Sequence, residues 1–317
     1  MATISVVIPT HDRRETLALA AASVSSQSEP PLEIIVVDDC SDPPVEPSWL
    51  EGAGAGSALR LLRLDSPSGA NRARNLGLSS AKGDWVLFLD DDDVFLPGKL
   101  EAYRAAAEAH PETGILTCLA RVEVPGAGAR YCITPSSAPT FEEQLVRNCV
   151  GTTSMVGVRK ADFEAAGGFD PELPARQDYE AWLRALKSGM AAMRIDRVLT
   201  EIRVEFGEGS VSKSAARNEE AMRRIEAAYA SDIAALPSPR RRAREAQKGI
   251  FLVHKLMLGN DRAGAARLAL RNALACRHLP SAALVPLALA GRRAFFRALA
   301  ARSPLPPEAR GEEGGRG

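Results

Sequence analysis

The feature that most restricts the fold is a unit repeated through the first hundred residues: a short apolar run, then a segment with helical composition. The runs are rich in branched aliphatic side chains, and the first one stops at Pro9. The predicted strands cover residues 4–8, 32–37, 59–64 and 85–89, and the predicted helices cover 14–26, 70–81 and 97–109. Nearly continuous apolar strands that alternate with helices predict a parallel sheet covered on both faces.

Polar residues follow three of these strands at the point where each strand ends. They are His11 and Asp12 after the first strand, Asp38 and Asp39 after the second, and Asp90, Asp91 and Asp92 after the fourth. Ligands of open α/β sheets bind at the carboxyl ends of the strands, so we expect these side chains to face one crevice. This convergence predicts an active site at that edge of the sheet.

The run Asp90-Asp91-Asp92-Asp93 is the most acidic of these strand ends. Adjacent carboxylates repel one another, so the run is costly unless a cation or solvent offsets the charge. Oxygen ligands favour Mg²⁺ or Mn²⁺, and Mg²⁺ sites often combine one or two carboxylates with substrate phosphates. The alternatives are a solvated acidic loop and an acidic helix N-terminus. The position of the run directly after a buried strand favours the cation site.

The rest of the chain divides by composition. Residues 110–214 mix strand-like and helical pieces and are expected to complete one domain over 1–214. From about residue 215 the chain is rich in Ala, Arg and Leu, which predicts a helical region of four helices over 215–302. The last segment, 303–317, is rich in Pro, Gly and Glu and is expected to be disordered.

Charge is distributed unevenly, although the whole chain is formally neutral. Residues 1–214 carry 21 Lys and Arg against 31 Asp and Glu, whereas residues 215–317 carry 19 against 9. The basic region suits an anionic surface such as lipid headgroups, and it lacks the zinc spacing and aromatic-basic interleaving of nucleic-acid binders. Five widely spaced cysteines without a CxxC pair favour a reducing, cytoplasmic setting.

Seven motifs, in order and at family-like spacing over about residues 3–205, resemble family 2 glycosyltransferases with the GT-A fold. They are ISVVIPTHDR (4–13), the Ser23 to Gln27 helix end, LEIIVVDDCSD (32–42), ARNLGL (73–78), KGDWVLFLDDDDVFLPGKL (82–100), GGFDPEL (167–173) and QDYEAWLR (177–184). The resemblance implies a Rossmann-like mixed α/β sheet, followed here by a C-terminal α-helical extension. It also implies a nucleotide-sugar donor, an inverting transfer and a Mg²⁺ or Mn²⁺ cofactor.

The resemblance carries roles to matched positions. The positions implied on the donor side are Pro9, Thr10 and His11 at the nucleoside, Asp39 at the base, Arg74 and Asn75 near the base and phosphates, and Asp90 and Asp91 at the ribose or the waters of the metal. Asp90 and Asp92 would hold the metal, as in a DXD motif, while Asp93 would cap the next helix. Asp178 matches the general base on the acceptor side; read by itself, it would be an acidic residue at a helix N-terminus.

Two departures from the family pattern concern this acceptor side. Gln177 stands where a glutamate usually precedes the base, and no histidine lies in the segment 202–206, where Glu205 is the available substitute ligand. The processive-synthase signature QxxRW is also absent, so we expect non-processive transfer to a glycan, glycolipid or other cell-envelope acceptor.

Two other classes use related features. A sugar nucleotidyltransferase would carry a Gly-rich phosphate loop after the first strand, where this chain has PTHDRRET. A non-catalytic GT-A-like binding protein would have no need of intact aspartates.

The basic helical tail has two interpretations. Residues 280–302 combine arginines with an apolar face, so they could lie on an anionic membrane or pack against the catalytic domain. The N-terminus has no basic segment before its short apolar run, and no stretch reaches the length of a membrane span, so we expect a cytoplasmic protein, peripheral on the inner membrane at most.

Overall fold

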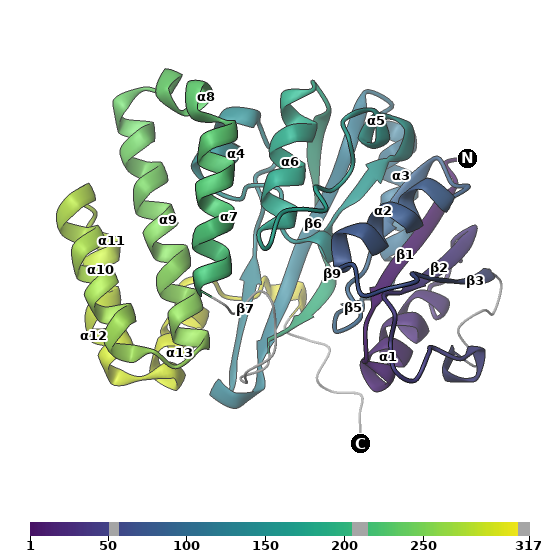
Figure 1. Cartoon of the computed structure of the whole chain (residues 1–317), viewed down its shortest axis with the longest axis horizontal. Helices are drawn as coiled ribbons and strands as arrows, with labels where there is room; N and C mark the ends of the chain where they lie inside the picture. Colours follow the sequence, from purple (N-terminus) through teal and green to yellow (C-terminus); the bar gives the residue numbers. More distant parts are fainter. Residues whose placement is uncertain (51–56, 205–214, 310–317) are drawn as a thin grey trace.

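The computed structural model describes residues 1–50, 57–204 and 215–309 (Figure 1). The first half contains β1 (Ile4–Thr10), α1 (Arg14–Ser25), β2 (Glu33–Asp38), η1 (Pro47–Leu50), β3 (Ala58–Arg63), α2 (Ala70–Ser80), β4 (Trp85–Phe88), β5 (Val94–Phe95) and α3 (Lys99–Ala109). The second contains β6 (Thr113–Val124), η2 (Pro125–Ala127), β7 (Ala129–Ile133), α4 (Phe141–Val146), η3 (Thr153–Met155), β8 (Gly157–Arg159), α5 (Lys160–Ala165), α6 (Gln177–Lys187) and β9 (Ala191–Arg203). Seven helices follow in the described part of the tail: α7 (Ala215–Ala228), α8 (Ala230–Ala235), α9 (Ser238–Leu258), α10 (Arg262–Cys276), α11 (Leu279–Ala282), α12 (Leu284–Ala290) and α13 (Arg292–Arg302), then η5 (Pro307–Ala309).

The strands form one mixed sheet with the order β3-β2-β1-β4-β8-β6-β9-β5, and β7 pairs with the outer part of β6. The four predicted strands β1 to β4 are parallel to one another. The second half differs from the all-parallel expectation, because β8 runs antiparallel to both β4 and β6, and β5 runs antiparallel to β9. The mixed α/β sheet implied by the family resemblance is confirmed.

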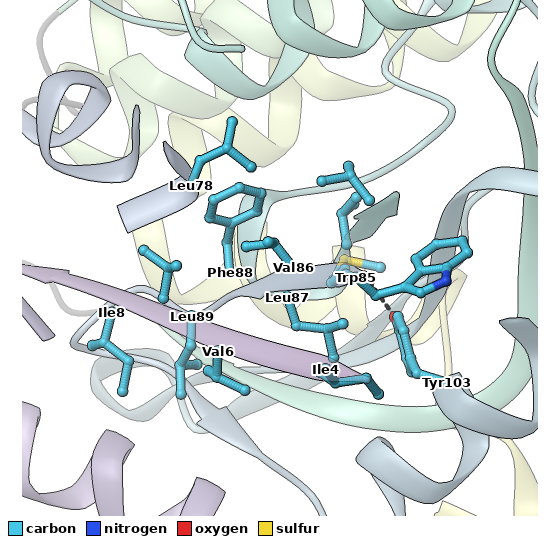
Figure 2. Packing of buried hydrophobic residues seen from close by; sticks show 14 of the residues in the cluster. Ile4, Val6, Ile8, Leu78, Trp85, Val86, Leu87, Phe88, Leu89 and Tyr103 are labelled. Carbon is cyan, nitrogen blue, oxygen red and sulfur yellow. Dashed lines mark hydrogen bonds between the residues drawn. The ribbon is translucent and has the colours of Figure 1, made fainter. Parts of the chain in front are cut away.

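Strand burial follows from the apolar runs. Every residue of β1, β2 and β4 is buried. Figure 2 shows Leu87 and Phe88 projecting from opposite faces of β4, as the period of a strand requires, with Tyr103 of α3 in the same cluster as Leu87. Helix α2 lies so close to β1 that a Cβ atom at Gly77 would stand 2.3 Å from Cγ1 of Val7. This close approach fixes the position of α2, which carries two of the predicted site residues.

Local differences from the predicted elements occur in all parts of the chain, and in the first half they are the unpredicted η1 and β5. Within the mixed segment 110–214, residues 153–158 are strand-like in sequence but form the short helix η3 and the start of β8. The tail has more helices than the four predicted, because further breaks fall at Tyr229, Ala283 and Gly291, the last with φ of 103°. Of the segment expected to be disordered, residues 303–309 are described, and Ser303 accepts a hydrogen bond from the Cys132 amide (2.8 Å).

The helical tail is packed on the sheet rather than separate from it. One hydrophobic cluster joins α4 and α6 to α7 and α8, and includes Leu145, Tyr179 and Ile225. A second joins the protruding β6–β7 pair to α9, α10, α12 and α13. Phe295 and Phe296 of α13 are buried in this second cluster, so the aromatic residues of the 280–302 segment pack inward. Over the described ranges, none of the helices combines the length and apolarity that crossing a bilayer requires.

Candidate active site

The carboxyl ends of β1, β2 and β4 meet, as their polar residues predicted. Strand β1 lies between β2 and β4 in the sheet, so its end is next to both. The Thr10 hydroxyl donates to Oδ2 of Asp91 (2.7 Å), and Nδ1 of His11 lies 2.8 Å from the Asp39 carbonyl. Because a carbonyl only accepts, Nδ1 of His11 carries the proton in this contact. Residues about 80 positions apart therefore form one polar edge.

The aspartate run is held by two arginines. Nη2 of Arg74 donates to Asp90 (2.6 Å), and Nη1 of Arg13 lies 3.0 Å from Asp91 and 2.6 Å from Asp92. Burial raises the pKa of Asp91 to about 6, although Thr10 and Arg13 act in the opposite direction. Burial and the neighbouring charge of Asp90 also raise the pKa of Asp92. Burial and the neighbouring carboxylates therefore disfavour the charged form of the run, and a bound cation would offset that penalty.

This donor set fits a hard divalent cation that a substrate helps to bind. Asp90 and Asp92 are partly exposed, with side chains 31% and 43% accessible, so their oxygens can reach a ligand. Within the described ranges, no three His, Cys, Asp or Glu side chains come together as a complete metal-binding group. Two carboxylates plus phosphate oxygens is the arrangement Mg²⁺ commonly adopts. The predicted substitute ligand Glu205 lies outside the described residues.

Asp93 is not a helix cap, contrary to the sequence-based expectation. It is buried, hydrogen-bonds the Ser154 side chain and the Arg203 backbone, and its pKa is raised well above the ordinary value by burial. The residue that precedes α3 is Gly98, and no side chain caps this helix. The reason is that β5 begins directly after Asp93 and pairs with β9, which places Asp93 beside Ser154 of η3 and Arg203 of β9 and several residues before α3.

Asp39 and Pro9 lie at the same edge of the sheet, with Pro9 buried in β1 beside Thr10. The two carboxylate oxygens of Asp39 accept hydrogen bonds from the amides of Ser68 (2.7 Å) and Gly69 (2.8 Å). Asp39 thereby holds the start of α2, and its remaining lone pairs are the ones a base could use. Asp38, in contrast, is fully engaged by the amides of Ser41 and Val45 and by Arg63.

Arg74 and Asn75 leave α2 in different directions. Arg74 is buried beneath the run and contacts Asp90, and its Nε has no hydrogen-bond partner among the described residues. Asn75 instead forms a reciprocal pair with the Phe169 backbone, donating to its carbonyl (2.8 Å) and accepting from its amide (2.9 Å). Both polar groups of Asn75 are therefore used to anchor the GGFDPEL segment to α2.

Asp178 opens α6 on the other side of the site. Its Oδ2 accepts from Nδ2 of Asn148 (3.2 Å), and Asn148 is itself bonded to the backbone of Gly151. Burial raises the pKa of Asp178, while the charges of Arg176, Lys255 and Arg74 oppose that rise. A carboxylate with a raised pKa that is held by an amide suits proton transfer at neutral pH.

Two links join Asp178 to the aspartate run. The segment 148–154 bonds Asp178 through Asn148 at one end, and the Asp90 amide donates to the Ser154 hydroxyl (3.0 Å) at the other. Arg74 bonds Asp90 and also lies close enough to Asp178 to stabilise its charged form. These links connect the predicted donor and acceptor carboxylates, although 88 positions separate Asp90 and Asp178 in the sequence.

Sequence reasoning missed several residues of this site. Arg13 ends the motif ISVVIPTHDR, but the sequence assigned it no role in the site. Its position three residues after the first strand could have indicated that it pairs with the aspartate run. Asn148 and Ser154 stand in the second half of the domain, where no strand-end pattern marks them. Arg176 precedes α6 with φ of 58°, and its guanidinium stacks 4.3 Å from the Tyr179 ring and 4.2 Å from the Phe251 ring of α9.

Comparison with known proteins decides the class. Residues 5–161 match the model described as Glycosyl transferase family 2. The chain belongs to this family, and it is a glycosyltransferase. The match spans β1 to β8, which includes the aspartate run and Asn148 but ends before Asp178.

Two relatives extend the comparison beyond that range. An uncharacterized glycosyltransferase of Haemophilus influenzae is 29% identical over 235 residues, covering 73% of this chain and 78% of its own length. The succinoglycan biosynthesis protein ExoO of Rhizobium meliloti is 29% identical over 333 residues, covering 96% of this chain and 91% of its own length. The similarity to ExoO therefore includes the helical tail.

Two solved structures share the fold. The S. aureus TarS fragment 1–349 in complex with UDP-GlcNAc has a TM-score of 0.54 at 16% identity, with 95% of this chain and 91% of TarS covered. The mannosyltransferase PcManGT from Pyrobaculum calidifontis, in complex with GDP-Man and Mn²⁺, has a TM-score of 0.57 at 17% identity, with 94% of this chain and 86% of PcManGT covered. These likenesses confirm the GT-A architecture of this family 2 glycosyltransferase with helices at its C-terminus.

Proposed function

We propose that this glycosyltransferase moves one sugar at a time, with inversion, from a UDP-linked sugar to a hydroxyl of a cell-envelope glycan or glycolipid. The observation that carries the proposal is the position of Arg74, which bonds Asp90 and stabilises the charge of Asp178. This link between the carboxylates suited to the donor diphosphate and the carboxylate suited to an acceptor proton supports one shared site. The family membership leaves the nucleotidyltransferase and the non-catalytic alternatives without support.

On the donor side, Asp90 and Asp92 would hold Mg²⁺ or Mn²⁺ together with the diphosphate. When bound, the cation supplies positive charge that offsets the charge on the leaving nucleoside diphosphate. Thr10 and Arg13 orient Asp91 and Asp92, and Asp39 and His11 lie beside them for the nucleoside. The bound UDP-GlcNAc of TarS and the bound GDP-Man and Mn²⁺ of PcManGT support a donor of this class.

On the acceptor side, Asp178 would take the proton of the attacking hydroxyl. Inversion requires the acceptor oxygen to attack the anomeric carbon from the face opposite the leaving group, and a base on that face removes the proton as the bond forms. Asn148 holds Oδ2 of the carboxylate, and the side chain is only half-buried, so an acceptor hydroxyl can reach it. The naming of ExoO as a succinoglycan biosynthesis protein supports a polysaccharide precursor as acceptor. Five free cysteines support a reducing compartment such as the cytoplasm.

The experiment compares Asp178→Asn with Glu180→Gln. Both changes remove one negative charge from the first turn of α6, but Glu180 is paired with Arg184 (2.8 Å), away from the aspartate run. Release of UDP, GDP or dTDP from a nucleotide-sugar panel is measured with Mn²⁺ or Mg²⁺ and with EDTA, with and without a lipid-linked acceptor pool. We expect Asp178→Asn to lower transfer by about 10²–10⁴-fold while donor binding is retained. Equal losses in both variants would refute the base assignment and favour a helix-dipole role.

A further inference from the structure

The helices α9 to α13 are strongly basic. Residues 238–302 carry 14 Lys and Arg against two acidic residues, Glu245 and Asp261. Some of these cations serve the fold; Arg244, for example, bonds the Tyr179 hydroxyl (3.0 Å). Others do not, and over the described ranges no acidic side chain pairs with Arg267 or Arg271 of α10. Exposed cations that have no such internal role indicate an anionic partner.

One face of α10 combines these unpaired cations with exposed leucines. Arg267, Leu270, Arg271 and Leu274 stand at positions i, i+3, i+4 and i+7, so they share one side of the helix. All four are exposed, and Leu270 and Leu274 are 50% and 72% accessible. The opposite side packs inward through Ala265, Ala266 and Ala269. We call the four exposed residues the α10 face; Figure 1 shows α10 at the outer edge of the molecule.

Exposed apolar side chains are concentrated near this face. Seven large hydrophobic residues of the described chain are exposed: Met1, Leu19, Leu32, Leu270, Leu274, Leu279 and Leu289. Four of the seven lie on α10, α11 and α12, and Leu279 is the most exposed of them at 84%. Exposed aliphatic side chains that are more numerous on these helices than on the rest of the described chain favour a contact with an apolar medium or partner here.

A basic groove adjoins the same face. It lies between α9 and α10, has a volume of about 410 Å³, and is lined by Arg241, Arg242, Lys248 and Arg271. Leu252 and Leu268 also line it, and Glu245 is its one acidic residue. Because Arg271 belongs to both the groove and the α10 face, a surface that meets the leucines also brings anionic groups to the groove.

We propose that the α10 face binds the surface of an anionic lipid bilayer. Leucines enter the boundary between headgroups and acyl chains, while flanking arginines extend to the phosphates. A second copy of the chain is a poorer partner, because a two-fold contact would bring the same arginines together. The face differs from the segment 280–302 considered from sequence, since Phe295 and Phe296 of that segment are buried. Vesicle binding needs neither donor nor acceptor, so its outcome is independent of glycosyl transfer.

The test is co-sedimentation of the full chain with phosphatidylcholine vesicles that contain or lack phosphatidylglycerol. We expect binding to the anionic vesicles, with affinity falling as salt is raised because the arginine contribution is screened. Leu270→Gln with Leu274→Gln should weaken this binding by about tenfold or more. The matched control is Leu19→Gln with Leu32→Gln, which changes two leucines that are 52% and 46% exposed elsewhere, and it should bind as the unchanged chain does.

Three results would overturn the proposal. One is equal binding to vesicles with and without phosphatidylglycerol. Another is an equal loss in the Leu270/Leu274 variant and in the Leu19/Leu32 control. The third is found by light scattering: a dimer that the Leu270/Leu274 variant dissociates, without vesicle binding, would assign the face to a second copy. Circular dichroism of each variant establishes that the helices remain folded.

Discussion

Among single residues, Asp178 is half-buried and accepts hydrogen bonds from the Asn148 side chain and the Tyr179 backbone. Burial favours the neutral acid, whereas the nearby cations favour the charged base, and burial is the larger effect. The raised pKa means that the proton is taken up at a higher pH than in an exposed aspartate. A base of this kind is active only when it has lost that proton.

We therefore expect kcat at saturating donor to fall as the pH drops through the raised pKa of Asp178, above the ordinary value of about 3.9. The measurement is a pH–rate profile with donor affinity determined separately, because protonation of the aspartate run affects donor binding. A kcat that stays constant down to pH 4 would contradict the assignment.

Asn148 is expected to act by positioning the base. Replacing it with leucine removes the amide that bonds Oδ2 of Asp178 and the contacts with Gly151. We expect Asn148→Leu to lower kcat by about 10–100-fold with little change in donor affinity, in keeping with losses at residues that orient other catalytic groups. Asn148→Asp, which keeps the size but brings a second carboxylate next to Asp178, should move the acidic limb of the pH profile upward. An unmoved limb would show that the two side chains do not interact.

Among the elements, α9 and α13 depend on a histidine that stays neutral. His254 packs 5.2 Å from the Phe296 ring and 6.3 Å from the Phe295 ring, measured between ring centroids. Burial, helped by the charge of Lys255, lowers its pKa to about 3 from an ordinary value of 6.5. Between these two pH values the unfolded chain binds a proton that the folded chain does not, so stability falls as the pH drops below about 6.5.

We expect the free energy of unfolding to fall by about 2 kcal/mol more in the unchanged chain than in His254→Leu between pH 7 and pH 5. Urea unfolding at the two pH values, followed by circular dichroism, gives the difference. His278, which bonds Ser281 (2.9 Å) near the surface, provides the control substitution His278→Asn. Parallel pH dependence in all three chains would mean that His254 is protonated in the folded state.

At the scale of the whole molecule, the helical tail covers apolar surface that the sheet alone exposes. The β6–β7 pair extends beyond the rest of the sheet, and Val122, Val124 and Tyr131 are buried there against α9, α10 and α13 (Figure 1). Cys132 of β7 also donates its amide to Ser303 beyond α13. The tail and the catalytic sheet therefore share one core.

We expect a chain that ends at residue 204 to aggregate rather than remain a folded catalytic domain. Removal of the helices exposes the β6–β7 residues and the α4–α6 cluster around Tyr179, and an apolar sheet surface with a free edge promotes association. Size-exclusion chromatography of the truncated chain checks this. A monomeric, active product would show that the tail is a separate module.

The sequence by itself determined the repeated strands, the acidic strand ends and the family motifs, because each depends on neighbouring residues in the chain. An apolar run is recognisable from neighbouring residues alone. The polar residues that follow a parallel strand must lie at the carboxyl edge of the sheet, whatever side chains they contact there. The helix N-terminus at Asp178 was predicted from a local pattern of the same kind. Only the tertiary structure decided how these residues are used. Asn75 bonds the Phe169 backbone and Arg13 pairs with Asp92. These contacts could not be predicted, because the partners lie about 80 or more positions away in the sequence and no local pattern indicates them. The phenylalanines of α13 are buried because they lie in the cluster that the β6–β7 pair forms with the tail. The leucines of α10 remain exposed because α10 contributes its alanine side to that cluster and its leucine side faces outward.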